Sequence, residues 1–70
     1  MPKKEYVEQY VAILDNALLG LFDESKEEEI LAKDKAALGD DYEAFEKQIT
    51  AAFDKVSEAR DALKKYAETL

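Results

Sequence analysis

The stretch 18-LLGLFDESKEEE-29 decides how the chain folds, because its character changes halfway along. Four large apolar side chains surround Gly20, and six of the last seven positions are charged. A helix could end at Gly20, with the glycine as its C-terminal cap, or it could run through Gly20 and end near Phe22. We favour the second alternative, because a cap at Gly20 would pair Leu21 with a polar residue of the preceding turn instead of an apolar one.

The residues before this break predict an amphipathic helix over residues 3–22. Pro2 suits the first helical turn, where its missing N–H costs nothing. Apolar residues then recur at steps of four and three, which places them on one stripe of a helix: Val7, Val11, Leu14, Leu18 and Leu21. A second set widens the apolar arc to about half the circumference: Tyr6, Tyr10, Ile13 and Ala17. We therefore expect this helix to have two neighbours.

A second helix is predicted over residues 25–38. Ser25 and Glu28 have the spacing of a capping box, in which each side chain satisfies the other residue's free backbone N–H. Acidic residues follow in the first turn, where the helix dipole favours them. The helix is thin in apolar residues, and Gly39 is predicted to be its C-terminal cap.

A third and longer helix is predicted over residues 41–69. Asp40 and Glu43 repeat the capping spacing at its start. Apolar residues then follow a three-four spacing typical of a left-handed coiled-coil seam: Tyr42, Phe45, Ile49, Ala52, Val56, Ala59, Leu63, Tyr66 and Leu70. No segment has the two-residue alternation of a strand. With short connections, these helices predict an all-α, up-down-up three-helix bundle, a single domain over residues 1–70.

The predicted helices differ in length, which leaves part of the third without a neighbour. At about 1.5 Å per residue, the helices measure roughly 30, 21 and 45 Å. In a bundle with tight turns, the first two helices would cover the third only to about Val56. The seam continues beyond that point through Leu63, Tyr66, Ala67 and Leu70. We predict that these four residues form an interface with a second copy or another protein; fraying of the last turns, or a shifted first helix, is the alternative.

The amino-acid composition excludes most kinds of catalytic and metal-binding site. The chain has no cysteine and no histidine, so nucleophile–histidine catalysis and the usual zinc ligands are absent. Its acidic residues suit helix starts and solvated faces, so we expect no enzymatic activity, no metal and no cofactor. A net charge of −7 disfavours binding to nucleic acid or to an anionic membrane surface. No targeting or transmembrane segment is recognisable, so the location is undetermined and cytoplasmic only by default.

Three functions remain open. The first is a non-catalytic protein-interaction or assembly module, either a homodimer or a partner of another protein. The second is a scaffold without biochemical activity, since capped helices in series and dipole-matched charges resemble those of designed three-helix bundles. Gly20 and the thin second helix depart from that pattern. The third is an acidic regulator that occupies a basic groove, whose binding would weaken at high salt.

Overall fold

The computed structural model describes residues 2–70, and it confirms that the chain is all-α. Three α-helices alternate with two short 3₁₀ segments: α1 (Lys3–Leu21), η1 (Glu24–Lys26), α2 (Glu27–Leu38), η2 (Gly39–Asp41) and α3 (Tyr42–Glu68). Helix α1 runs through Gly20, as favoured from the sequence, and its next residue, Phe22, is extended. Helix α2 begins two residues later than predicted, at Glu27, because a 3₁₀ turn precedes it.

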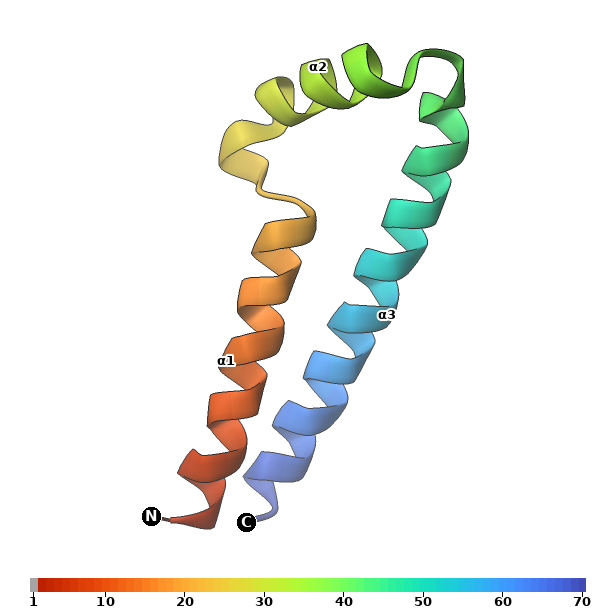
Figure 1. Ribbon diagram of the computed structural model, residues 1–70. Helices are drawn as coiled ribbons and strands as arrows, with labels where there is room; N and C mark the ends of the chain where they lie inside the picture. The colour runs from red at the N-terminus through yellow and green to blue at the C-terminus, as the bar shows by residue number, and fades with distance from the viewer. Residues whose placement is uncertain (1) are drawn as a thin grey trace.

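The predicted up-down-up three-helix bundle is wrong. The chain instead follows one bent helical path of 66 residues from Lys3 to Glu68, interrupted only at Phe22 and Asp23. Helix α1 lies antiparallel along α3, and α2 crosses over the end of this pair (Figure 1). Among residues 2–70, the α2 backbone approaches α3 only slightly and does not come close to α1. The result is a flat helical hairpin with extents of 48 × 19 × 13 Å.

Helix α2 stays out of a bundle because it has too little apolar surface to bury. Its half-buried residues are Ile30, Asp34 and Leu38, which form one narrow line with an acid in the middle. No residue of α2 is buried. Burial of an apolar stripe supplies most of a helix's stabilisation in a protein, and α2 has almost none to offer. It therefore connects the ends of α1 and α3 without packing along them.

The start of α2 uses a different cap from the one predicted. Asp23 accepts hydrogen bonds from the backbone N–H of Ser25 at 3.0 Å and from the Ser25 hydroxyl at 2.6 Å. These bonds lower the pKa of the Asp23 carboxyl, the side-chain bond contributing most. The Ser25–Glu28 capping box is thus replaced by an aspartate cap on η1, and Lys26, the residue before α2, makes no side-chain cap.

The turn between α2 and α3 depends on Gly39. It is the C-cap residue of α2 and has a φ of 54°, which residues with a Cβ rarely adopt. Asp40, predicted to cap α3 together with Glu43, lies inside η2 instead. Asp41, the residue that precedes α3, makes no side-chain capping bond.

The contact between α1 and α3 contains the small core of the molecule. The stripe predicted on α1 faces α3, and its residue Leu18 is 6% exposed. On α3 the most buried residue is Ala67, at 2%. Between them, half-buried residues continue the contact on both helices, among them Val11, Leu14 and Leu63. The prediction that the first helix leaves the third uncovered beyond Val56 is wrong, because α2 crosses the end of the hairpin and α1 runs back along the C-terminal part of α3 (Figure 1).

The seam predicted on α3 is only partly its contact stripe. Ala59, Tyr66 and Leu70 belong to the seam but are exposed, while Arg60 and Ala67 lie nearer the contact. A strict seven-residue repeat drifts by about 20° per heptad on a straight helix. Over four heptads this drift is about 80°, so the last seam residues point away from α1.

The two glycines predict opposite effects of the same substitution. Gly20→Ala should raise the free energy of unfolding by about 0.5–1 kcal/mol, because glycine weakens a helix interior. A Cβ at Gly20 meets nothing within 4 Å. Gly39→Ala should lower the free energy of unfolding by about 1 kcal/mol, because the φ of Gly39 is positive. Denaturant unfolding followed by circular dichroism measures both, and a destabilised Gly20→Ala variant would contradict an exposed helix at Gly20.

Candidate interaction surface

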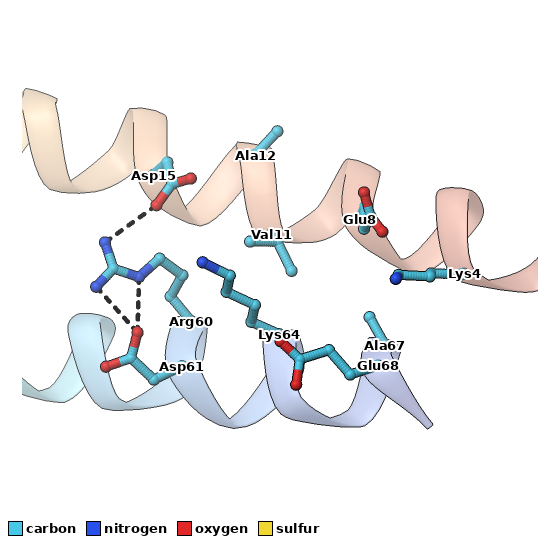
Figure 2. Close-up of a pocket in the computed structure, with 10 residues that line it drawn as sticks. All are labelled: Lys4, Glu8, Val11, Ala12, Asp15, Arg60, Asp61, Lys64, Ala67 and Glu68. Carbon is cyan, nitrogen blue, oxygen red and sulfur yellow. Dashed lines mark hydrogen bonds and ion pairs between the residues drawn. The ribbon is translucent and has the colours of Figure 1, made fainter. Parts of the chain in front are cut away.

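The two broad sides of the hairpin differ in chemistry. One side carries a groove of about 590 Å³ between α1 and α3 (Figure 2). Charged side chains of both signs line it: Lys4, Glu8, Asp15, Arg60, Asp61, Lys64 and Glu68. We call this side the charged groove. Because acids and bases alternate along it, the groove has no strong preference for an ion of either sign.

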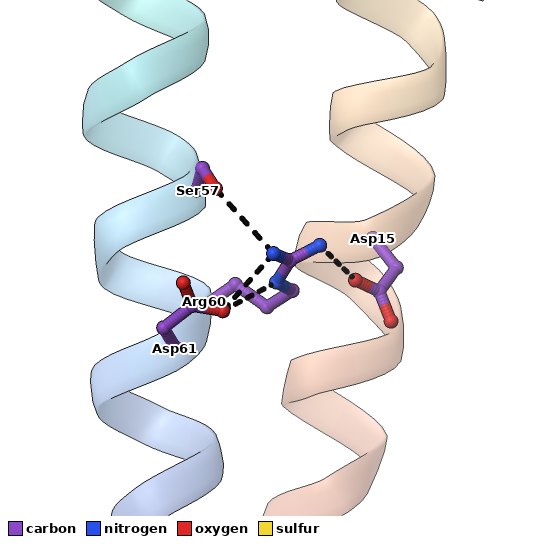
Figure 3. A network of polar contacts seen from close by, with 4 residues as sticks. All are labelled: Asp15, Ser57, Arg60 and Asp61. Atoms are coloured by element: carbon purple, nitrogen blue, oxygen red, sulfur yellow. Dashed lines mark hydrogen bonds and ion pairs between the residues drawn. The ribbon is translucent and has the colours of Figure 1, made fainter.

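Arg60 connects the two helices across the charged groove (Figure 3). Its Nη1 donates to Asp15 Oδ1 of α1 at 3.1 Å, and its Nε donates to Asp61 Oδ1 at 3.0 Å. Its Nη2 donates to Ser57 Oγ at 3.4 Å and also lies 3.0 Å from Asp61 Oδ1. The hydrogen bond to Asp15, followed by that to Asp61, raises the pKa of Arg60. Arginine is charged at any ordinary pH, so the bond to Asp15 aligns α1 against α3 as a charge-assisted contact.

Sequence reasoning missed Arg60, although a signal was present. Arg60 is the chain's single arginine, and it falls four residues after Val56 and seven before Ala67. That spacing places it on the contact stripe at helical periodicity. A lone arginine at such a position, facing a helix that carries an aspartate, is a recognisable sign of a pairing between helices.

Within residues 2–70, no group of three or more His, Cys, Asp and Glu side chains is arranged to hold a metal ion. None of the described side-chain nitrogen or oxygen atoms is buried without a hydrogen-bond partner. The bond between Arg60 and Asp15 joins the two helices, and the other bonds of Arg60 lie within α3.

The opposite side of the hairpin is apolar. On α1, all four residues that widen the predicted apolar stripe are exposed, with Tyr10 at 50% and Ile13 at 59%. On α3 the exposed seam residues join it, with Tyr66 at 55%. We call these seven residues the apolar face: Tyr6, Tyr10, Ile13, Ala17, Ala59, Tyr66 and Leu70.

Helix geometry places both stripes on the same side. At 100° per residue, the α1 stripe lies about 100° from the α1 contact stripe, and the α3 stripe lies about 70° from the α3 contact stripe. In an antiparallel pair these rotations carry both stripes to one side. The residues of the charged groove, which lie on the other side of each contact stripe, meet in one groove as this geometry requires. The apolar face is therefore continuous across the two helices.

The two tyrosines of α1 are ordered against each other on this face. The ring centroids of Tyr6 and Tyr10 lie 5.8 Å apart, with an interplanar angle of 63°, an edge-to-face arrangement. A hydrogen bond with the Tyr6 side chain is the main cause that raises the pKa of Tyr10. The two rings contact each other, and each side chain remains about half exposed.

The four residues predicted as an interface are divided by the structure. Tyr66 and Leu70 lie on the apolar face, whereas Ala67 is buried between α3 and α1. Leu63 is half-buried near the contact stripe. Only half of the predicted set is therefore accessible. For the α1 residues of the apolar face, the sequence predicted a second neighbour of the helix, and among residues 2–70 α1 packs against α3 alone.

Comparison of the chain with protein-family models, curated proteins and solved structures finds no match. Among residues 2–70, no helix is long and apolar enough to cross a membrane.

We predict that Arg60 contributes to stability through its geometry as well as its charge. Arg60→Lys keeps the charge but loses the fork that reaches Asp15 and Asp61, so the midpoint of thermal unfolding should fall. Asp15→Asn should have a similar effect, and the double variant should lose less than the sum of the two. Lys33→Met, which removes the exposed pair between Lys33 and Glu29 at 3.2 Å, is the control and should change little. Additive losses would contradict the pairing.

Proposed function

We propose that this protein is a non-catalytic assembly module that associates with a second copy of itself through the apolar face. Two hairpins stacked on these faces would form a four-helix arrangement, in which each apolar stripe gains the neighbour it lacks. A two-fold axis would bring the same seven residues together from both copies. The observation that carries the proposal is the continuous apolar surface across α1 and α3.

The solvent-exposed area of the chain is consistent with a second copy as its partner. The chain exposes 5667 Å². A compact monomer of its mass exposes about 4,400 Å², so the hairpin has an excess of about 1,300 Å². A standard interface removes about 800 Å² from each partner. The broad side of the hairpin, 48 × 19 Å, is large enough to supply that area.

The shape leads to the same conclusion. The radius of gyration is 15.5 Å. A compact chain of this length has a radius of about 11 Å. Among residues 2–70 only Leu18 and Ala67 are buried, so the hairpin has a very small core of its own. Burial of apolar area at about 25 cal/mol per Å² is the main stabilising term in folding, so a second copy would add what this core lacks.

The distribution of charge favours this face over the rest of the surface. A net charge of −7 makes two copies repel each other at long range. The seven residues of the apolar face are uncharged, and Gln9 and Asn16 on the outer flank of its α1 stripe are uncharged as well, while Lys3 lies beside Tyr6 and Tyr10 at the start of α1. Contact at this face keeps the acids of both copies on the outside. Tyrosine is also common at protein interfaces.

Sedimentation equilibrium over a range of concentrations tests the proposal. The unsubstituted chain should be a dimer, and Tyr10→Glu should weaken association at least tenfold, about 1.4 kcal/mol. Leu19→Glu is the matched control, because Leu19 is on the same helix, is 59% exposed and lies off the apolar face. Circular dichroism should show both variants to be helical.

A chain that stays monomeric at high micromolar concentration would overturn the proposal and favour the alternative of an inert scaffold. Equal weakening by Tyr10→Glu and Leu19→Glu would also overturn it, because association would then not depend on the apolar face.

A further inference from the structure

The end of the hairpin beneath α2 is open for a geometric reason. Helix α2 has 12 residues. It is therefore about 18 Å long, whereas packed helices lie about 8–10 Å apart. Because α2 connects the ends of α1 and α3, it holds them further apart than packing would (Figure 1). A pocket of about 680 Å³ lies there, and we call it the end pocket.

The end pocket is lined by all three phenylalanines of the chain, Phe22, Phe45 and Phe53. Each side chain keeps part of its surface exposed, and Ile30 and Ile49 beside them are half-buried. The two buried residues of the hairpin, Leu18 and Ala67, do not line the pocket. Phe45 and Phe53 are half-buried and Phe22 is 37% exposed, so the three phenylalanines are gathered where the chain covers them only in part.

The polar part of the lining is acidic. Glu27, Asp34 and Glu46 line the pocket, and no lysine or arginine does. Lys35 lies close by, with its Nζ 5.5 Å from the centroid of the Tyr42 ring. Burial raises the pKa of Tyr42, and the charges of Glu46 and Asp34 raise it further, as expected in a negative potential. An occupant that carries positive charge next to an apolar group would match this lining.

We propose that the end pocket binds a segment of a partner protein that presents leucine or phenylalanine side chains flanked by lysine or arginine. Its volume lies within the range of about 300–1,000 Å³ found for binding pockets. Residues 2–70 contain no strand to extend, which excludes binding by strand addition. In this proposal the segment is an amphipathic helix, with apolar anchors inside the pocket and basic residues against the acids. The end pocket shares no residue with the apolar face. This proposal is therefore independent of self-association.

Titration of the full chain with three synthetic peptides tests this site. The probe is the capped peptide KLFKLLKLFK, and in two control peptides every lysine is replaced by glutamine or by glutamate. Nuclear magnetic resonance should show that the lysine peptide shifts the ring signals of Phe22, Phe45 and Phe53. It should bind at least tenfold more tightly than the glutamine peptide, and the glutamate peptide should not bind.

Charge variants show whether the acids of the pocket provide this preference. The double variant Asp34→Asn with Glu46→Gln keeps the apolar lining and should reduce the affinity for the lysine peptide to that for the glutamine peptide. The matched control, Glu29→Gln with Asp54→Asn, changes one acid on each of the same two helices outside the pocket and should bind like the unsubstituted chain.

Three results would overturn the proposal: no binding of the lysine peptide, equal binding of all three peptides, or shifts confined to the apolar face. Tyr10→Glu should bind the lysine peptide as well as the unsubstituted chain does. Failure of self-association and failure of the end pocket would therefore be seen separately.

Discussion

The packing of α1 against α3 is the one tertiary contact on which the rest of the structure depends. Two antiparallel helices can bury only the stripes that face each other, so each helix keeps a large exposed surface. Here that contact contains Leu18 and Ala67, and the Arg60–Asp15 bond fixes its alignment. The exposed remainder is divided into a charged groove on one side and the apolar face on the other. Both follow from a hairpin that lacks a third helix along its length.

The periodicity of the sequence predicts the helices well but predicts their arrangement poorly. The α1 stripe that ends at Leu21 and the turn at Gly39 are local features, and their positions follow from spacing and backbone freedom. Whether α2 packs along α3 depends on how much apolar surface the two helices can bury against each other. The local sequence pattern of α2 does not determine this. The drift of a seven-residue repeat explains why Tyr66 was placed in the seam and lies on the surface. Arg60 was overlooked because a charged residue on a contact stripe interrupts the apolar pattern.

Of the four residues predicted as an interface, Tyr66 and Leu70 are exposed, Ala67 is buried and Leu63 is half-buried. The wide apolar arc of α1 already contained further exposed residues, because Tyr6 and Tyr10 have no second neighbour to cover them. The sequence could not say whether that neighbour belongs to the same chain. In the hairpin no such neighbour exists among residues 2–70, and the lack of a third packed helix also explains why the phenylalanines beneath α2 are only partly covered. Self-association and capture of a basic, apolar segment are two separate ways to cover these surfaces.

Isotope-filtered nuclear magnetic resonance on an equal mixture of labelled and unlabelled chains tests the central claim most directly, because it detects only contacts between copies. A hairpin that completes itself with a second copy predicts intermolecular contacts from the rings of Tyr6, Tyr10 and Tyr66, and none from Leu18 or Ala67. Intermolecular contacts centred on Leu18 and Ala67 would contradict it, because α1 would then pack against α3 of another copy. A sample without any intermolecular contact at high concentration would contradict it as well.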